Sequence, residues 1–167
     1  GMWGISYPGF YVSAGMIDAH PALKAVSPQA PVTDYYLGDD SFHNGAFMLA
    51  HNFSFYVDFP VRGPRPGPPA QARDFQYGTK DGYQFYLQGG SLMDLSRKYG
   101  LADNPYWMQN LEHTTYDDFW KARSIWRHFR DVAPAVLVVG GWFDAEDLMG
   151  PLRTFGTLRA ESPKTTS

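Results

Sequence analysis

The chain has 167 residues, of which 44% are hydrophobic, and it contains no cysteine and carries a formal net charge of −3. Its size allows one domain with a real core, whereas the acidic balance argues against a nucleic-acid partner, because phosphate contacts need a basic surface. Without cysteine there is neither a disulfide framework nor a thiolate metal site, and no apolar run approaches the roughly 20 residues that cross a bilayer.

The chain opens with a cluster of glycine around a serine, Gly4-Ile5-Ser6-Tyr7-Pro8-Gly9. This pattern is typical of a nucleophile elbow, where a strand turns sharply into a helix and only glycine neighbours leave room for the turn. Ser6 is therefore the candidate nucleophile, and the amide of Tyr7 is a candidate oxyanion donor. The common elbow has its second glycine one position earlier, so an ordinary glycine-serine turn remains the alternative at this point.

The first third of the chain predicts alternating helix and strand. Residues 7–17 are small and apolar and predict a helix that ends before Pro21. Residues 23–27 predict a short strand. A helix is predicted from about Ser41, with Asp39 or Asp40 as its cap. The proline-rich tract at 60–69 fits neither helix interior nor central strand, so we predict a connecting loop there.

The rest of the chain predicts further helices and one buried strand. Helices are expected at 91–99, at 106–111 and, from the spacing of its aromatic residues, at 116–129. Residues 135–139 form a continuous apolar, β-branched run, which indicates a strand of a parallel sheet covered on both faces. A last helix is expected from about 146 to 161, so the chain is predicted to have an α/β fold.

Three carboxylates follow this last strand: Asp144, Glu146 and Asp147. Catalytic groups gather at the carboxyl ends of parallel strands, and an aspartate that follows the nucleophile is what a Ser, Asp, His triad requires. Asp144 is the candidate acid. Two interpretations stay open for the others: they are stabilised in the first turn of a helix capped by Asp144, or they form a negative pocket for an ammonium group.

Four sequence motifs occur in order along the chain. They are Gly4-x-Ser6-Tyr7-x-Gly9, Asp18-x-His20-Pro21-Ala22-Leu23-Lys24, Gly38-Asp39-Asp40-x-Phe42-His43-x-Gly45-Ala46-Phe47, and Trp142-Phe143-Asp144-x-Glu146-Asp147. Together they resemble the cocaine esterase and X-prolyl dipeptidyl peptidase superfamily of serine hydrolases. Within it, the α-amino acid ester hydrolases, also called cephalosporin acylases, are the most similar.

This resemblance implies a site and a domain organisation. It implies Ser6 as the nucleophile, the Tyr7 amide in the oxyanion hole and Asp144 as the triad acid. It implies that Asp40, Glu146 and Asp147 bind the α-ammonium group of the substrate, with Asp39 as the substitute for Asp40 if the register differs by one. Residues 1–40 and 132–167 would then belong to a partial α/β-hydrolase core, and 41–131 to an inserted helical cap.

The triad histidine of the family follows the acid, but all five histidines of this chain precede Asp144. They are His20, His43, His51, His113 and His128. We therefore expect an internal fragment of a longer enzyme that is inactive by itself, since a serine hydroxyl without a base is a weak nucleophile.

The expected reaction is acyl transfer from a small-molecule ester or amide through a covalent Ser6 acyl-enzyme. An X-Pro dipeptidyl peptidase or a broad carboxylesterase is the first alternative, and an aromatic-rich binding module without catalysis is the second. We expect no cofactor, no metal, no nucleic acid and no membrane partner; assembly into a homo-oligomer is left open. Members of the family are often exported, so a periplasmic or extracellular location is the expectation.

Overall fold

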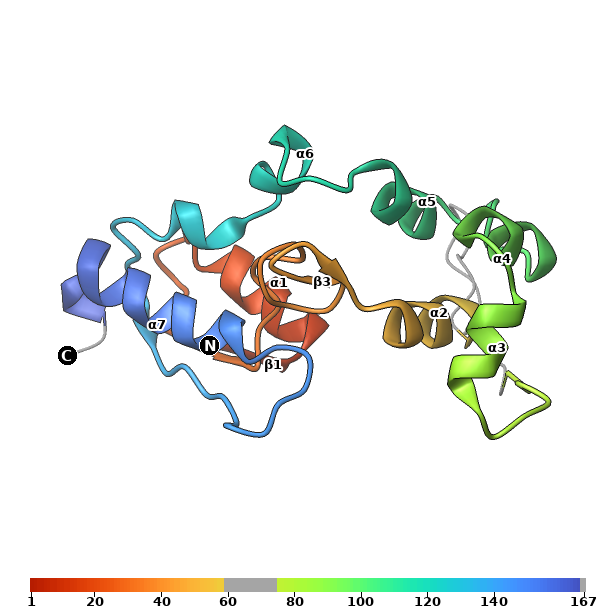
Figure 1. Cartoon of the computed structure of the whole chain (residues 1–167). Coiled ribbons are helices and arrows are strands. Elements are labelled where there is room, and N and C mark those ends of the chain that lie inside the picture. Colours follow the sequence, from red (N-terminus) through yellow and green to blue (C-terminus); the bar gives the residue numbers. More distant parts are fainter. Residues whose placement is uncertain (59–74, 166–167) are drawn as a thin grey trace. The chain divides into compact units, whose positions relative to one another are not determined.

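The computed structural model describes residues 1–58 and 75–165, so the predicted loop at 60–69 lies outside the described residues (Figure 1). The chain forms two compact units, which are described separately below. The first comprises residues 1–47 together with 115–167, and the second comprises residues 48–114. None of the described helices is long and apolar enough to cross a membrane.

The first unit contains a three-stranded parallel sheet. Its strands are β1 (Met2–Ile5), β2 (Ala25–Gln29) and β5 (Ala135–Val136), in the order β1-β2-β5. The helix α1 (Tyr7–Gly15) connects β1 to β2, as the small apolar residues at 7–17 predict. Hydrogen bonds from the amides of Leu137 and Val139 to β2 continue the ladder beyond β5. The predicted strands and the α/β class are thus present.

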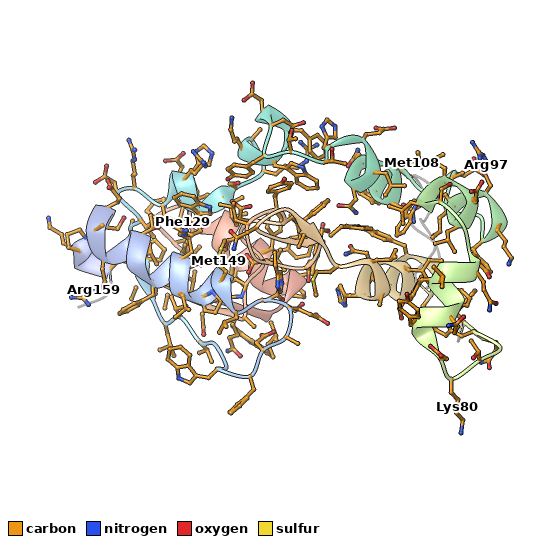
Figure 2. The ribbon with its side chains drawn as sticks, in the orientation of Figure 1. Lys80, Arg97, Met108, Phe129, Met149 and Arg159 are labelled. Carbon is orange, nitrogen blue, oxygen red and sulfur yellow. The ribbon has the colours of Figure 1, made fainter. Side chains whose placement is uncertain are left out.

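The sheet buries one face. On that face Val26 is 3% exposed and packs with Val12 and Met16 of α1 and Leu158 of α7 (Met149–Glu161). Phe129, labelled in Figure 2, belongs to the same core.

The other face of the sheet remains exposed in the described part of the chain. Its apolar side chains are Trp3, Ile5, Leu137 and Val139, with exposed fractions between 41% and 71%. The prediction that 135–139 is covered on both faces is therefore wrong for these residues. The physical reason is that α1 and α7 both pack on the Val26 face.

A hairpin replaces the helix predicted from Ser41. Strand β3 (Phe42–His43) pairs with the antiparallel strand β4 (Ala46–Phe47). The two residues between them, Asn44 and Gly45, have φ values of 50° and 87°. Positive φ at both central positions is what a tight hairpin turn requires, and Asn-Gly is its preferred pair. This local turn signal overrides the helical spacing of the neighbouring apolar residues.

The single helix predicted at 116–129 is broken into two short pieces. These are α6 (Asp118–Lys121) and η1 (Ile125–His128). Between them, the hydroxyl of Ser124 donates to the carboxylate of Asp34 at 2.7 Å, and Tyr116 and Trp126 donate to the same oxygen. Three donors converge on one buried acceptor, and this tertiary contact breaks the helix.

The second unit is helical. It contains α2 (Leu49–Asp58), α3 (Gly82–Gln88), α4 (Leu92–Lys98) and α5 (Pro105–Glu112). The helices predicted at 91–99 and 106–111 are confirmed; Ser91 caps α4 in a capping box with Asp94, and Asn104 caps α5. Phe53 and Trp107, both fully buried, lie in an aromatic cluster that forms the centre of this unit.

Candidate active site

Ser6 lies where β1 passes into α1, with φ of 59° and ψ of −122°. A positive φ is strained for a residue with a side chain, and such strain persists only where the surroundings hold it. Here the Ser6 amide donates to the carbonyl of Gln29 at 3.0 Å, and the Phe10 amide donates to the carbonyl of Ser6 at 3.0 Å. These two bonds tie the turn to β2 and to the first turn of α1.

The glycines on either side of Ser6 are required by close backbone contacts. A Cβ atom at Gly4 would lie 2.6 Å from the carbonyl of Pro8, and one at Gly9 would lie 2.7 Å from the carbonyl oxygen of Gln29. Both distances are shorter than real Cβ contacts. The prediction that only glycine leaves room beside the turn is confirmed at both positions.

Tyr7 is the first residue of α1, directly after Ser6. Its amide therefore belongs to the N-terminal turn, where backbone N–H groups point out of the helix and the helix dipole is positive. An oxyanion formed at a carbon bonded to the Ser6 oxygen would develop next to this end of the helix. The geometry suits an oxyanion donor.

Asp144 stands in the loop that follows the β5 ladder, and it organises the next residues. Its Oδ1 accepts the amide of Glu146 at 3.0 Å and the amide of Asp147 at 2.9 Å. The helix expected from 146 begins later, at Met149, because these two amides bond to Asp144 in a turn. Asp144 is thus not a cap of α7, and its carboxylate is held in a defined orientation.

Asp147 is buried and touches the candidate nucleophile. The side chain is 2% exposed, and the hydroxyl of Ser6 donates to its Oδ2 across 3.4 Å. The other carboxylate oxygen, Oδ1, is buried without a hydrogen-bond partner among the described residues. A buried acceptor without a donor is uncommon in native proteins and points to a missing polar partner.

The pKa of Asp147 is raised from 3.8 to about 9, chiefly by burial and in addition by the negative charges of Asp40, Asp39 and Asp144. No cation of the described chain balances this group in an ion pair, so the neutral form is favoured near neutral pH. A cation bound beside Asp147 would reverse this preference, because an opposite charge favours the ionised carboxylate.

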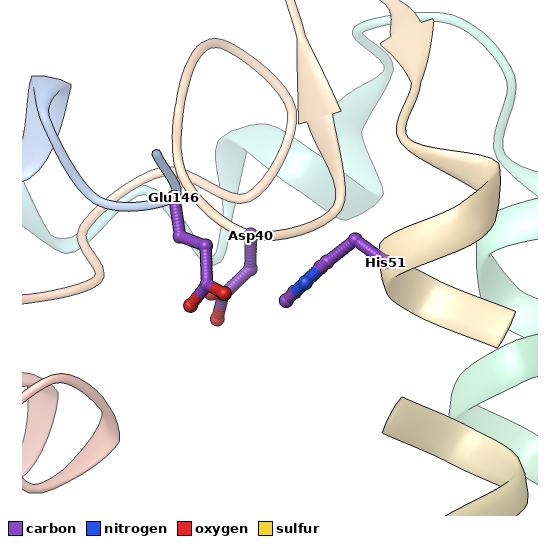
Figure 3. A group of neighbouring side chains, drawn as sticks. All are labelled: Asp40, His51 and Glu146. Carbon is purple, nitrogen blue, oxygen red and sulfur yellow. The ribbon is translucent and has the colours of Figure 1, made fainter. Parts of the chain in front are cut away.

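Two further carboxylates lie next to each other in the same unit. Figure 3 shows the side chains of Asp40 and Glu146 side by side, and their carboxylate oxygens lie within 4.8 Å of each other. Asp40 is partly buried and Glu146 is exposed. The hydrogen bond and the charge interaction between Asp40 and Asp147 connect the pair to the buried carboxylate. Oxygen ligands of this kind suit an ammonium group or a hard cation.

Asp39 is fully buried, with an exposed fraction of 0%. Both of its carboxylate oxygens accept protein donors: Oδ2 binds the amides of Thr33 and Asp34, and Oδ1 binds the amide of Gly150 at 2.8 Å. Burial raises the pKa of Asp39 by more than these hydrogen bonds lower it, so that the pKa stands at about 6. With its oxygens occupied, Asp39 is a poor substitute for Asp40 as a ligand.

The structure thus brings the side chains of Ser6 and Asp147 into contact and places Asp40 beside Glu146. It also joins Asp147 to Asp144 through a hydrogen bond from the Asp147 amide to the Asp144 carboxylate. The resemblance to the superfamily implied these residues as a set. The direct contact between Ser6 and Asp147, and the burial of Asp39 against Gly150, carried no signal in the sequence. A histidine bonded to Asp144 is not among the hydrogen bonds of the described residues.

The comparison with protein families decides where this chain belongs. The model of the X-Pro dipeptidyl-peptidase (S15) family matches residues 1–166, almost the entire chain. The chain belongs to this family. The resemblance predicted from the four motifs is therefore confirmed.

Two solved structures are similar to this S15 chain over nearly all of its length. One is an aminopeptidase from a marine sediment Thaumarchaeota archaeon, with 29% identity and a TM-score of 0.82 over 97% of this chain. The other is an α-amino acid ester hydrolase, with 31% identity and a TM-score of 0.79 over 98% of this chain. This chain spans about a quarter of either structure, 26% in each case. No curated protein matches the chain.

The α/β-hydrolase type predicted for the S15 chain is confirmed by its sheet, its flanking helices and these two neighbours. The neighbours are a peptidase and an esterase, so they share a hydrolase fold while differing in the bond that their names say they cleave. A shared fold does not settle the substrate, which depends on the side chains of the site.

Proposed function

We propose that this chain carries the nucleophile, the triad acid and the ammonium site of a serine hydrolase. Its substrates are esters or amides with a free α-amino group beside the acyl carbon. Ser6 attacks that carbon and forms an acyl-enzyme, which water or an amine then cleaves.

The observation that carries this proposal is the 3.4 Å distance between the Ser6 hydroxyl and Oδ2 of Asp147. In an α-amino ester the nitrogen is two bonds from the acyl carbon, a separation of about 2.5 Å. An ammonium group on a substrate that reaches Ser6 would therefore come within reach of a carboxylate at this distance. The buried Oδ1 of Asp147 would gain the donor that it lacks among the described residues.

The remaining groups have defined parts in the reaction. The base, a histidine supplied from outside residues 1–167, takes the Ser6 proton as the oxygen bonds to the acyl carbon, and later gives it to the leaving group. Asp144 orients this histidine and stabilises its charged form. The Tyr7 amide donates to the oxyanion, and Asp40 and Glu146 share the ammonium group with Asp147.

The same geometry distinguishes two peptidase types within the family. In an X-Pro dipeptide substrate the amino group lies one residue further from the scissile carbonyl, about 3.3–3.6 Å more of extended chain. A carboxylate that touches the nucleophile is too near for that amino group. The arrangement supports release of a single amino acid rather than a dipeptide, consistent with an aminopeptidase and an amino acid ester hydrolase as neighbours.

The test compares three substrates with the complete hydrolase: alanine methyl ester, methyl propionate, which lacks the amino group, and an alanyl-proline anilide. We expect the amino ester to be cleaved with a kcat/KM at least ~10-fold higher than the other two, because only it places an ammonium beside Asp147. Equal values for the first two esters would contradict the ammonium site. Preference for the anilide would favour the dipeptidyl peptidase.

The nucleophile is tested with Ser6→Ala and, as a matched control, Ser27→Ala in β2 of the same unit. Ser6→Ala should abolish turnover and labelling by a fluorophosphonate probe, and Ser27→Ala should leave both unchanged. Labelling of the Ser6→Ala variant at the wild-type rate would exclude Ser6. Failure of the probe to label the wild-type enzyme would favour the aromatic-rich binding module.

A further inference from the structure

We propose that Asp39 is a positioning residue that sets the place of Asp40 relative to Glu146 and Asp147, and thereby controls selectivity for substrates with an α-amino group. This inference rests on the proposed function. It concerns a residue that does not touch the substrate but joins the two chain segments that would.

Asp39 collects four hydrogen bonds on one buried carboxylate. Oδ2 accepts the Thr33 amide at 2.8 Å, the Thr33 hydroxyl at 3.2 Å and the Asp34 amide at 3.0 Å. Oδ1 accepts the Gly150 amide at 2.8 Å, and Gly150 lies 111 residues further along the chain. One carboxylate thus holds its own loop with one oxygen and the start of α7 with the other.

The two segments joined in this way carry the ammonium ligands. Asp40 follows Asp39 directly and has a φ of 46°, so its side chain leaves the loop in a direction fixed by a strained backbone. Glu146 and Asp147 lie just before Leu148, the residue that precedes α7, and Gly150 is the second residue of this helix. Movement at Asp39 would therefore change the separation between Asp40 and the other two carboxylates.

The loop that carries Asp39 and the start of α7 are also packed closely against each other. A Cβ atom at Gly150 would lie 1.7 Å from the carbonyl oxygen of Pro31, and one at Gly38 would lie 2.8 Å from Cβ of Met149. Backbones approach this closely only where glycine is present. Because the two segments are already in close contact, hydrogen bonds lost by replacing Asp39 cannot be offset by closer packing of the segments.

A purely structural role would affect all substrates alike, and the chain offers a matched control for it. Asp34 belongs to the same loop and is 1% exposed, and its carboxylate also accepts several donors. Its side-chain donors lie in the segment 116–126, and none of its bonds among the described residues reaches α7. Asp34→Asn thus disturbs an equally buried carboxylate without loosening the Gly150 contact.

The experiment measures KM and kcat of the complete hydrolase for alanine methyl ester and for methyl propionate. The variants are Asp39→Asn, Asp34→Asn and wild type. In Asp39→Asn an amide nitrogen faces N–H donors, so we expect the ligands to shift and KM for the amino ester to rise ~10-fold or more, since a misplacement of about 1 Å can cost up to about 100-fold. KM for methyl propionate should change less than ~2-fold. Asp34→Asn should leave the ratio of the two KM values at the wild-type level.

Each outcome decides the inference. An unchanged KM ratio in Asp39→Asn, in an enzyme whose wild type prefers the amino ester, would overturn it. A wild type without that preference would instead contradict the proposed function. If Asp39→Asn does not fold, Thr33→Val removes one of the four bonds, and an unchanged ratio in this milder variant would equally overturn the role of Asp39.

Discussion

The hydroxyl of Ser6 lies 3.4 Å from Oδ2 of Asp147, although 141 positions separate the two residues in the sequence. Their contact follows from the parallel sheet: Ser6 leaves the carboxyl end of β1, and the loop 140–147 leaves the same end of the β5 ladder. The pairing of both strands with β2 brings the two ends to one edge. The candidate nucleophile and a buried acid meet there, and their local environments lead to the predictions below.

The positive φ of Ser6 predicts an unusual order of stability among its variants. Ser6→Gly should be more stable than Ser6→Ala by about 1 kcal/mol, because glycine adopts φ of 59° without steric cost. At Ser27, within β2, the order should be reversed, since glycine weakens a strand. Denaturant unfolding of the four variants measures this. The same order at both positions would contradict strain at the elbow.

The close contact at Gly150 predicts a large loss of stability when this residue is replaced by alanine. Gly150→Ala should lower the free energy of unfolding by roughly 3 kcal/mol or more, because its Cβ would overlap the carbonyl oxygen of Pro31 at 1.7 Å. Gly156 lies in the same helix, and a Cβ added there would meet nothing within 4 Å, so Gly156→Ala should gain about 0.5–1 kcal/mol. Thermal unfolding distinguishes the two, and similar effects at both positions would argue against the tight contact.

The raised pKa of Asp147 predicts that the protein becomes less stable as the pH rises. Its pKa rises from 3.8 to about 9 on folding, so between these values the folded state binds the proton more tightly than the unfolded state. Stability from this group is complete below pH 4 and is lost as the pH rises toward 9. Asp39, with a pKa of about 6, adds a similar loss that is complete near pH 6.

Asp147→Asn removes the pH dependence of stability that Asp147 contributes. Above pH 6, where the contribution of Asp39 is complete, the difference between variant and wild type is due to Asp147 alone. Relative to wild type, the variant should gain about 1–3 kcal/mol of unfolding free energy between pH 6 and pH 9. It should also bind α-amino substrates more weakly, so greater stability would accompany lower activity. Chemical denaturation at a series of pH values is the measurement. Parallel curves for wild type and variant would show that Asp147 does not titrate in this range.

We predict that the buried carboxylate of Asp34 stabilises the conformation in which the chain is broken between α6 and η1. Its Oδ2 accepts the hydroxyls of Tyr116 and Ser124 and the indole N–H of Trp126. Asp34→Asn loses a charged acceptor for these donors and should cost about 2–4 kcal/mol of unfolding free energy. Asp118, whose side chain is fully exposed, provides the control, and Asp118→Asn should change stability by less than about 0.5 kcal/mol. Equal costs would contradict the prediction.

The sequence alone determined those structural features that depend on residues a few positions apart in the chain. The glycines around Ser6 define the elbow, Ser91 begins a helix that ends before Gly100, and the apolar run at 135–139 pairs with β2. Each of these signals lies within a few positions of the structure that it specifies, because caps, tight turns and strand ladders are formed by adjacent backbone groups. The four motifs, taken together, also indicated the family.

Only the tertiary structure decided which residues meet. Asp39 and Asp40 are adjacent acids in the sequence, yet one is enclosed by four donors and the other lies beside Glu146. The helix expected at 116–129 breaks because Asp34, more than 80 positions away, attracts its polar side chains. A buried carboxylate takes its properties from donors and charges that folding brings to it, and the order of residues does not state which ones these are.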